Sequence, residues 1–204
     1  RRKPFFDIDV DVAKVEKEPK EIKEYVLSNY GWSICIHLYH AIIRVFTRMN
    51  IKYNINSDFI WTHSCSENKY SYHLIINNWY HSNHYQGEQF YHEVISHVPA
   101  IIKPYIDHQV YKSTQNIRML NAMKYGTSRV KKIIYEWSLQ NFDGSVHTVP
   151  LKHRSSVPQL PNDERLRLII QDNNEMMACS VSFVDLCECL PDYPALSTLR
   201  KIDF

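Results

Sequence analysis

Two aspartates near the start of the sequence are spaced so that both could ligate a metal ion. Asp7 and Asp9 lie in residues 5–12, where apolar side chains alternate with acidic ones as in a half-buried strand. Side chains at i and i+2 of a strand project from the same face, and hard divalent cations prefer such oxygen ligands. Alternating acidic residues are also typical of a solvated strand face, and Asp11 fits that interpretation. The pair alone leaves both interpretations open.

A second polar pair lies in residues 69–76, which also read as a strand. Ser71 and His73 share one face, where they could donate hydrogen bonds to phosphate oxygens. The apolar residues Leu74 and Ile76 share the other face. Because the chain has eleven histidines, an isolated Ser-x-His pattern fits an ordinary surface histidine equally well.

A third acidic residue, Asp107, follows the apolar Ile106 and precedes a Val-Tyr pair. An Asn-Ile-Arg segment ending at Arg118 comes next, with Lys124 beyond it. Arginine forms bidentate pairs with carboxylates as readily as with phosphates. Asp107 and Arg118 could therefore be a structural ion pair or part of an anion-binding site.

In this order, the three elements resemble the motifs of the archaeo-eukaryotic primase superfamily, and in particular those of its primase-polymerase branch. The motifs are an apolar strand ending in D-x-D or D-x-E, an S-x-H strand, and an apolar residue with Asp followed by V-Y and N-x-R. The resemblance spans roughly residues 5–124, and its third motif is the most specific. Within the branch, the chain resembles the primase domain of primase-helicases of large DNA viruses that infect eukaryotes.

This resemblance implies a DNA primase, a nucleotidyltransferase that makes nucleic-acid primers from nucleoside triphosphates for DNA replication. Asp7, Asp9 and Asp107 would be the catalytic residues and would hold two Mg²⁺ or Mn²⁺ ions. The nucleotide's phosphates would be bound by Lys69, Ser71, His73, Arg118 and Lys124. A single-stranded DNA template and a helicase, fused or in a complex, are the implied partners. The site of action would be the host cytoplasm, at a viral replication site, or the nucleus.

The elements that must position these residues indicate an α+β fold, with helices packed on a largely antiparallel sheet. The resemblance implies an RRM-like sheet in a two-lobed catalytic core, with part of the N-terminal lobe upstream of residue 1. We expect residues 1–140 to form the catalytic core and residues 141–204 a loop-rich extension of the same domain. Helices are predicted at residues 20–29, 32–49, 85–102 and 182–190, and strands at residues 5–12, 58–64, 69–77, 105–111, 116–120 and 131–139.

Bulk properties narrow the class of protein without fixing its function. The net charge of +2 and the pI near 8.2 are too mild to indicate nucleic-acid binding by themselves. Five cysteines, an odd number, do not suggest a disulfide framework and favour free thiols in an intracellular compartment. The sequence contains no apolar run of the length that a membrane span needs.

Two weaker patterns bear on partners and metals. Basic residues in the second half, Lys131 among them, stand near Tyr125, Tyr135 and Trp137, a mixture that suits a single-stranded template or a merely solvated face. Cys187 and Cys189 could bind zinc in principle. We do not expect it, because a C-x-C pair on the helix predicted there would direct its thiols apart.

Two other functions fit parts of the pattern. A nucleotidyltransferase of the same fold could serve repair or end joining, since the fold does not fix the substrate. A non-catalytic module could hold single-stranded nucleic acid on an RRM-like sheet. The carboxylates disfavour this second alternative, because they would repel phosphate unless metal ions intervene.

Overall fold

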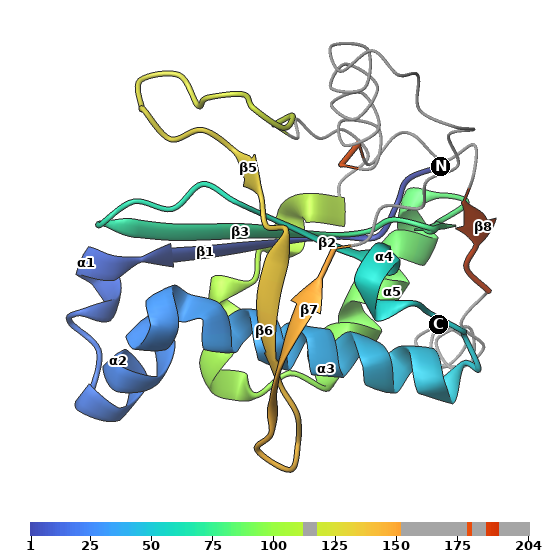
Figure 1. Cartoon of the computed structure of the whole chain (residues 1–204), viewed down its shortest axis with the longest axis horizontal. Helices are drawn as coiled ribbons and strands as arrows, with labels where there is room; N and C mark the ends of the chain where they lie inside the picture. Colours follow the sequence, from blue (N-terminus) through green and yellow to red (C-terminus); the bar gives the residue numbers. More distant parts are fainter. Residues whose placement is uncertain (112–117, 152–178, 181–186, 192–204) are drawn as a thin grey trace, which may run out of the picture.

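The computed structural model describes residues 1–111, 118–151, 179–180 and 187–191. A four-stranded antiparallel sheet, in the order β1-β3-β2-β5, runs through its middle (Figure 1). The strands are β1 (Phe5–Asp11), β2 (Phe59–His63), β3 (Lys69–Ile76) and β5 (Lys132–Ile133). This mixed α/β architecture with an antiparallel sheet agrees with the class predicted from sequence.

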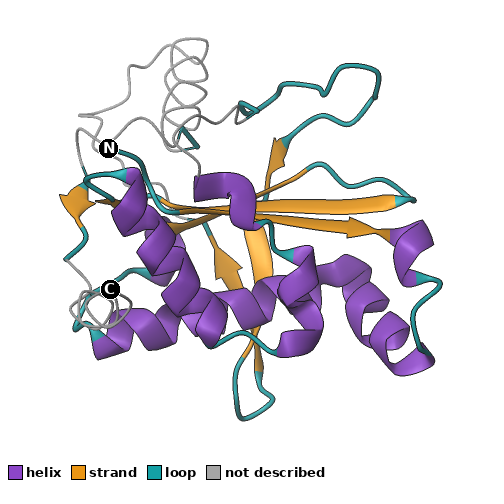
Figure 2. Cartoon of the chain, turned by 180° about the vertical axis from the view of Figure 1, so that it is seen from behind, coloured by secondary structure: helices purple, strands orange, loops and turns teal. Residues whose placement is uncertain are grey.

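The longer helices gather on one face of the sheet, as both views show (Figures 1 and 2). Phe6, Ile8 and Val10 of β1 point to this face and are fully buried, because alternate strand residues project to the same side. They belong to one apolar core with α3 and α5. The helices are α1 (Val12–Val15), α2 (Lys20–Leu27), α3 (Trp32–Arg48), α4 (Ile55–Asp58) and α5 (His84–Ser96), with 3₁₀ turns η1 (Ser28–Gly31), η2 (Ala100–Tyr105) and η3 (His108–Tyr111).

The opposite face of the sheet is covered at one end only. Phe5, Ile60 and Ile75 form a small second apolar cluster there with Val110, from η3, and Leu120. At the other end of β1 and β3 this face carries polar side chains instead. We call this side of the sheet the open face.

A separate hairpin helps to close the helix side. It consists of β6 (Glu136–Gln140) and β7 (Val146–Pro150), and its Trp137 and Leu139 join the main core. Trp32 packs edge-on against Trp137 and donates its indole N–H to the carbonyl of Ser138 at 2.9 Å. A further short pair, β4 (Trp79–Tyr80) and β8 (Glu188–Cys189), is parallel.

The helix at residues 32–49 and the hairpin of the second and third strands were predicted correctly. The helix predicted at 85–102 ends at Ser96, and Pro99 separates it from η2. The strand predicted at 131–139 is two strands in different sheets, and the region after residue 141 contains β7. The helix predicted at 182–190 is wrong at its end, where β8 runs, and residues 181–186 lie outside the described part.

The strand predicted at residues 105–111 is also wrong, since the chain forms η2 and η3 there. Only Ile106 bridges to β1, opposite Ile8. Asp107 then accepts a hydrogen bond from the backbone N–H of Gln109, which turns the chain away from the sheet. Of the strand predicted at 116–120, residues 118–120 form no strand, and residues 116–117 lie outside the described part.

Among the helices that the structure describes, none is both long enough and apolar enough to cross a membrane.

Candidate active site

The pairing of β1 with β3 brings two of the predicted motifs together on the open face. Asp7 lies opposite His73, and Asp9 lies opposite Ser71. Residues directly opposite each other in an antiparallel pair project to the same face with their side chains in reach. The i, i+2 spacing of both motifs therefore becomes a four-residue polar patch.

Backbone contacts bring the third motif to the same place. The N–H of Asp107 donates to the carbonyl of Asp7 at 2.8 Å, next to the bridge between Ile106 and Ile8. The side chain of Asp107 is in turn fixed by its hydrogen bond from the N–H of Gln109, at 2.8 Å. Asp107 is thus held beside β1, although it is distant in the sequence.

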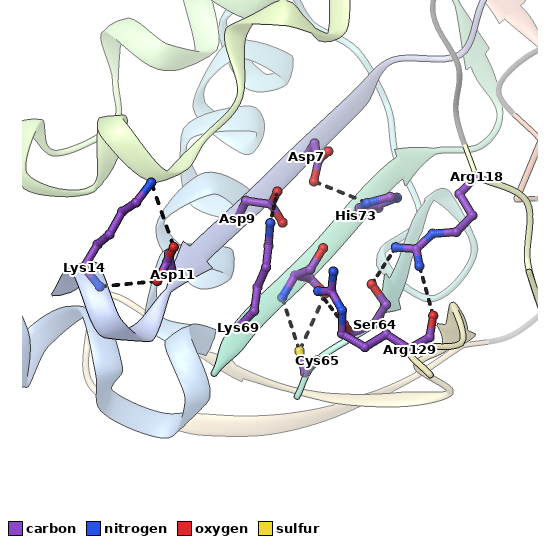
Figure 3. Close-up of polar contacts among 11 residues, drawn as sticks. Asp7, Asp9, Asp11, Lys14, Ser64, Cys65, Lys69, His73, Arg118 and Arg129 are labelled. Atoms are coloured by element: carbon purple, nitrogen blue, oxygen red, sulfur yellow. Dashed lines mark hydrogen bonds and ion pairs between the residues drawn. The ribbon is translucent and has the colours of Figure 1, made fainter. Parts of the chain in front are cut away.

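The carboxylates of Asp7 and Asp9 each face a basic group (Figure 3). Lys69 Nζ lies 2.7 Å from Asp9 Oδ2, and His73 Nε2 lies 3.3 Å from Asp7 Oδ1. The contact between Asp7 and His73 lacks hydrogen-bond alignment, so the buried Oδ1 of Asp7 has no hydrogen-bond partner within the described residues. An orphaned carboxylate oxygen is costly unless a cation or donor reaches it, so Asp7 suits a metal ligand.

Arg118 is held in place from two sides. Its guanidinium donates to Ser64 Oγ at 2.7 Å and to the carbonyl of Arg129 at 3.0 Å (Figure 3). Its own carbonyl accepts from the amine of Lys131 at 2.8 Å. These contacts fix the guanidinium before any ligand binds, which favours recognition of an anion because little orientation is lost on binding.

All of the predicted site residues line one pocket of about 490 Å³, a size that suits a small-molecule ligand. Its wall carries three carboxylates and four Lys or Arg side chains, so it can accommodate both cations and a polyanion. The predicted residues in the wall are Asp7, Asp9, Lys69, Ser71, His73, Asp107, Arg118 and Lys124, and those not assigned to it from sequence are Phe5, Val110, Met123 and Arg129.

No three His, Cys, Asp or Glu side chains of the described residues stand close enough together to hold a metal ion by themselves. An ion in this pocket would need further oxygen ligands besides the carboxylates. Mg²⁺ commonly meets this need with one or two carboxylates, substrate phosphates and waters. The donor set here fits that mode of binding.

Asp11 shares the strand but has another role. It is the N-cap of α1, where Oδ1 accepts from the N–H of Lys14 at 3.3 Å, and it does not line the pocket. The sequence alone could not separate Asp11 from Asp7 and Asp9 by spacing. The start of a helix directly after it provides the difference.

Two further residues support the site and were missed or misread in the sequence. Ser64, which accepts from Arg118, is buried in the turn after β2. Lys131 was grouped with basic residues that a template could contact, but it is 1% exposed, and its amine lies 5.8 Å from the ring centre of Phe5. Burial lowers the pKa of Lys131 to about 8. No local pattern marks a lysine as buried, because its burial depends on how the segment after Arg118 folds back.

No protein-family model matches the chain. It is similar to the putative helicase/primase complex protein of African swine fever virus. In isolate Pig/Kenya/KEN-50/1950 the identity is 30% over 135 residues, which is 62% of this chain and 12% of the viral protein. In strain Badajoz 1971 Vero-adapted it is 30% over 139 residues, 62% of this chain and 13% of the viral protein.

These matches relate the chain to a viral protein named for a primase. The chain spans only about an eighth of the length of these relatives. The similarity therefore concerns one segment of a much longer protein.

Proposed function

We propose that this chain is the catalytic domain of a DNA primase-polymerase, which makes nucleic-acid primers from nucleoside triphosphates on a single-stranded DNA template. The observation that carries the proposal is the convergence of Asp7, Asp9 and Asp107 with four Lys or Arg side chains in one pocket. Phosphoryl transfer depends mainly on positioning and charge neutralisation, and this pocket offers groups for both. The name of the viral relatives, which refers to a helicase/primase complex, also supports a primase function.

Within this proposal, Asp7, Asp9 and Asp107 hold two Mg²⁺ or Mn²⁺ ions together with the phosphate oxygens of the nucleotide. When bound, the ions would assist deprotonation of the attacking 3′-hydroxyl and neutralise charge on the pyrophosphate leaving group. The orphaned Oδ1 of Asp7 supports its assignment as a ligand.

The basic side chains of the pocket orient the triphosphate. Arg118 is preorganised by Ser64 and donates its remaining N–H groups to phosphate oxygens. Lys69 now pairs with Asp9, so metal binding at Asp9 would release the amine for the phosphates. The remaining phosphate contacts are assigned to Ser71, His73 and Lys124.

The proposal also covers the fold class of the sheet and a partner of the domain. We assign the sheet to the RRM-like class, within a two-lobed primase-polymerase core. We also propose that a helicase acts with this domain, in the same polypeptide or in a complex, because the viral relatives are named for such a complex.

Binding of a fluorescent ATP analogue, titrated with Mg²⁺ and with EDTA, tests the proposal directly. We expect Mg²⁺ to tighten binding by about tenfold or more, and Asp107→Asn to abolish the metal effect while leaving the unfolding midpoint near that of the wild type. A wild-type chain that binds the analogue equally well in EDTA, or does not bind it, would contradict the proposal.

A further inference from the structure

The segment that follows Asp107 has an unusual charge pattern. Residues 108–135 contain six Lys or Arg, of which Lys131 is buried, and no Asp or Glu, whereas the whole chain has 24 basic and 22 acidic residues. A stretch with charges of one sign attracts a polyanion. The three carboxylates of the pocket lie outside this stretch.

Residues 118–131, which we call the arm, fold back on themselves. Asn121 and Lys131 pair through a 2.8 Å hydrogen bond, Lys131 donates back to Ala122, and Met123 bridges to Val130. A turn at Gly126, with φ of 74°, reverses the chain. Figures 1 and 2 show the loop before β5 projecting beyond the sheet, on the side away from the helices.

The arm exposes several large aromatic and apolar side chains. Tyr125, beside the turn, is 102% exposed, and Met119 and Met123 are more than half exposed. Met123 also lines the catalytic pocket. Aromatic and apolar side chains presented among cations are the usual means of binding unpaired bases, because every base has a face that can stack.

Arg129 connects the arm to the pocket. It lines the pocket wall, and its guanidinium donates to the carbonyl of Ser64 through a long contact of 3.5 Å (Figure 3). A guanidinium has five N–H donors, so this contact leaves donors for a phosphate group. The carbonyl of Arg129 accepts from Arg118, so the arm and the nucleotide-binding arginine are fixed to each other.

We propose that the arm binds the single-stranded DNA template and leads it into the catalytic pocket. Arg129 contacts the backbone phosphates, and Tyr125 and Met123 pack against unpaired bases. This inference rests on the proposed function, because a template is the strand that a primase must hold next to its nucleotide. The inference adds to the proposed function the segment and the side chains that bind the template.

The test measures fluorescence anisotropy of a fluorescein-labelled single-stranded oligodeoxynucleotide with the full 204-residue chain. Tyr125→Ala should raise the Kd about tenfold, and Tyr125→Trp should retain wild-type affinity because it keeps the stacking surface. Arg129→Gln should weaken binding and lower the slope of log K against log salt by about one. Tyr85→Ala is the matched control, since Tyr85 is exposed but lies on α5 at the helix-covered side.

The proposal is overturned if the wild-type chain does not bind the oligonucleotide, or if Tyr125→Ala and Arg129→Gln bind it as the wild type does. Binding of the ATP analogue is measured on the same preparations. Loss of DNA affinity in Tyr125→Ala with intact nucleotide binding supports the arm as a separate site. If the wild type binds DNA through the arm but no nucleotide, the proposed function fails while the arm's role stands.

Discussion

Asp7 on β1 and His73 on β3 lie directly opposite each other, with Asp7 Oδ1 and His73 Nε2 3.3 Å apart at the wall of the pocket. The two residues are separated by more than sixty positions in the sequence, and the antiparallel register is what joins them. Their contact lacks the alignment of a hydrogen bond, so each can turn to a ligand without losing a strong partner.

His73→Ala should therefore weaken binding of a nucleoside triphosphate without unfolding the protein. Losing a hydrogen bond to a charged phosphate is expected to raise the Kd about tenfold or more. The measurement is titration of the fluorescent ATP analogue in Mg²⁺. His63→Ala is the matched control, because His63 lies opposite Tyr72 and so shares the helix-side face. Equal losses in both variants would point to a general structural effect.

Two lysines that each pair with an aspartate of β1 should differ in their effect on nucleotide binding. Lys69 pairs with Asp9 at the pocket, whereas Lys14 pairs with Asp11 outside it, at 3.9 Å. We expect Lys69→Gln to raise the Kd of the triphosphate about tenfold, through loss of a charge-assisted contact. Lys14→Gln should leave the Kd unchanged, because Lys14 does not line the pocket. Unchanged affinity in Lys69→Gln would remove that lysine from the site.

The contribution of two buried lysines to the stability of the protein should rise with pH between about pH 8 and 10. Burial lowers the pKa of Lys131 and of Lys3 to about 8, whereas an unfolded chain keeps a lysine protonated up to about pH 10.4. In this window the unfolded chain binds more protons, so deprotonation favours the folded state. Each lysine contributes a slope of up to about 1.4 kcal/mol per pH unit.

Lys131→Met should remove one lysine's share of that slope, as measured by urea unfolding from pH 7 to 10. Lys132→Met is the control, since Lys132 is the exposed neighbour and should leave the slope intact. A slope unchanged by Lys131→Met would show that the amine of Lys131 titrates normally. Buried acids act in the opposite sense at high pH. Burial raises the pKa of Cys35 well above its usual value and that of Tyr91 to about 12, so ionisation of these groups favours unfolding.

The grouping of the candidate site residues was more predictable from sequence than the fold around them. Alternation fixes which residues of β1 and β3 share a face, so Asp7 with Asp9 and Ser71 with His73 could be grouped by their spacing alone. Their register could not be predicted, since it depends on pairing between distant segments. The position of Asp107 beside β1 could not be predicted either, because it depends on a backbone hydrogen bond to Asp7, which is distant in the sequence.

The errors share a physical cause. Residues 131–139 have a strand-like composition throughout, but the chain leaves the main sheet after Ile133 and enters a second hairpin at Glu136. Composition can favour an extended backbone, but it does not determine which sheet the strand joins. The buried Lys131 and Ser64 were missed for the same reason, because their environment is built by segments far away in the sequence.

Primer synthesis on an unprimed single-stranded DNA template, with Mg²⁺ or Mn²⁺ and labelled nucleotides, tests the central claim most directly. The comparison is between the wild type, the double variant Asp7→Asn/Asp9→Asn, and Asp11→Asn, whose carboxylate caps α1 outside the pocket. We predict products from the wild type and from Asp11→Asn, and none from the double variant. Synthesis by the double variant at the wild-type rate would contradict the assignment of Asp7 and Asp9 as metal ligands.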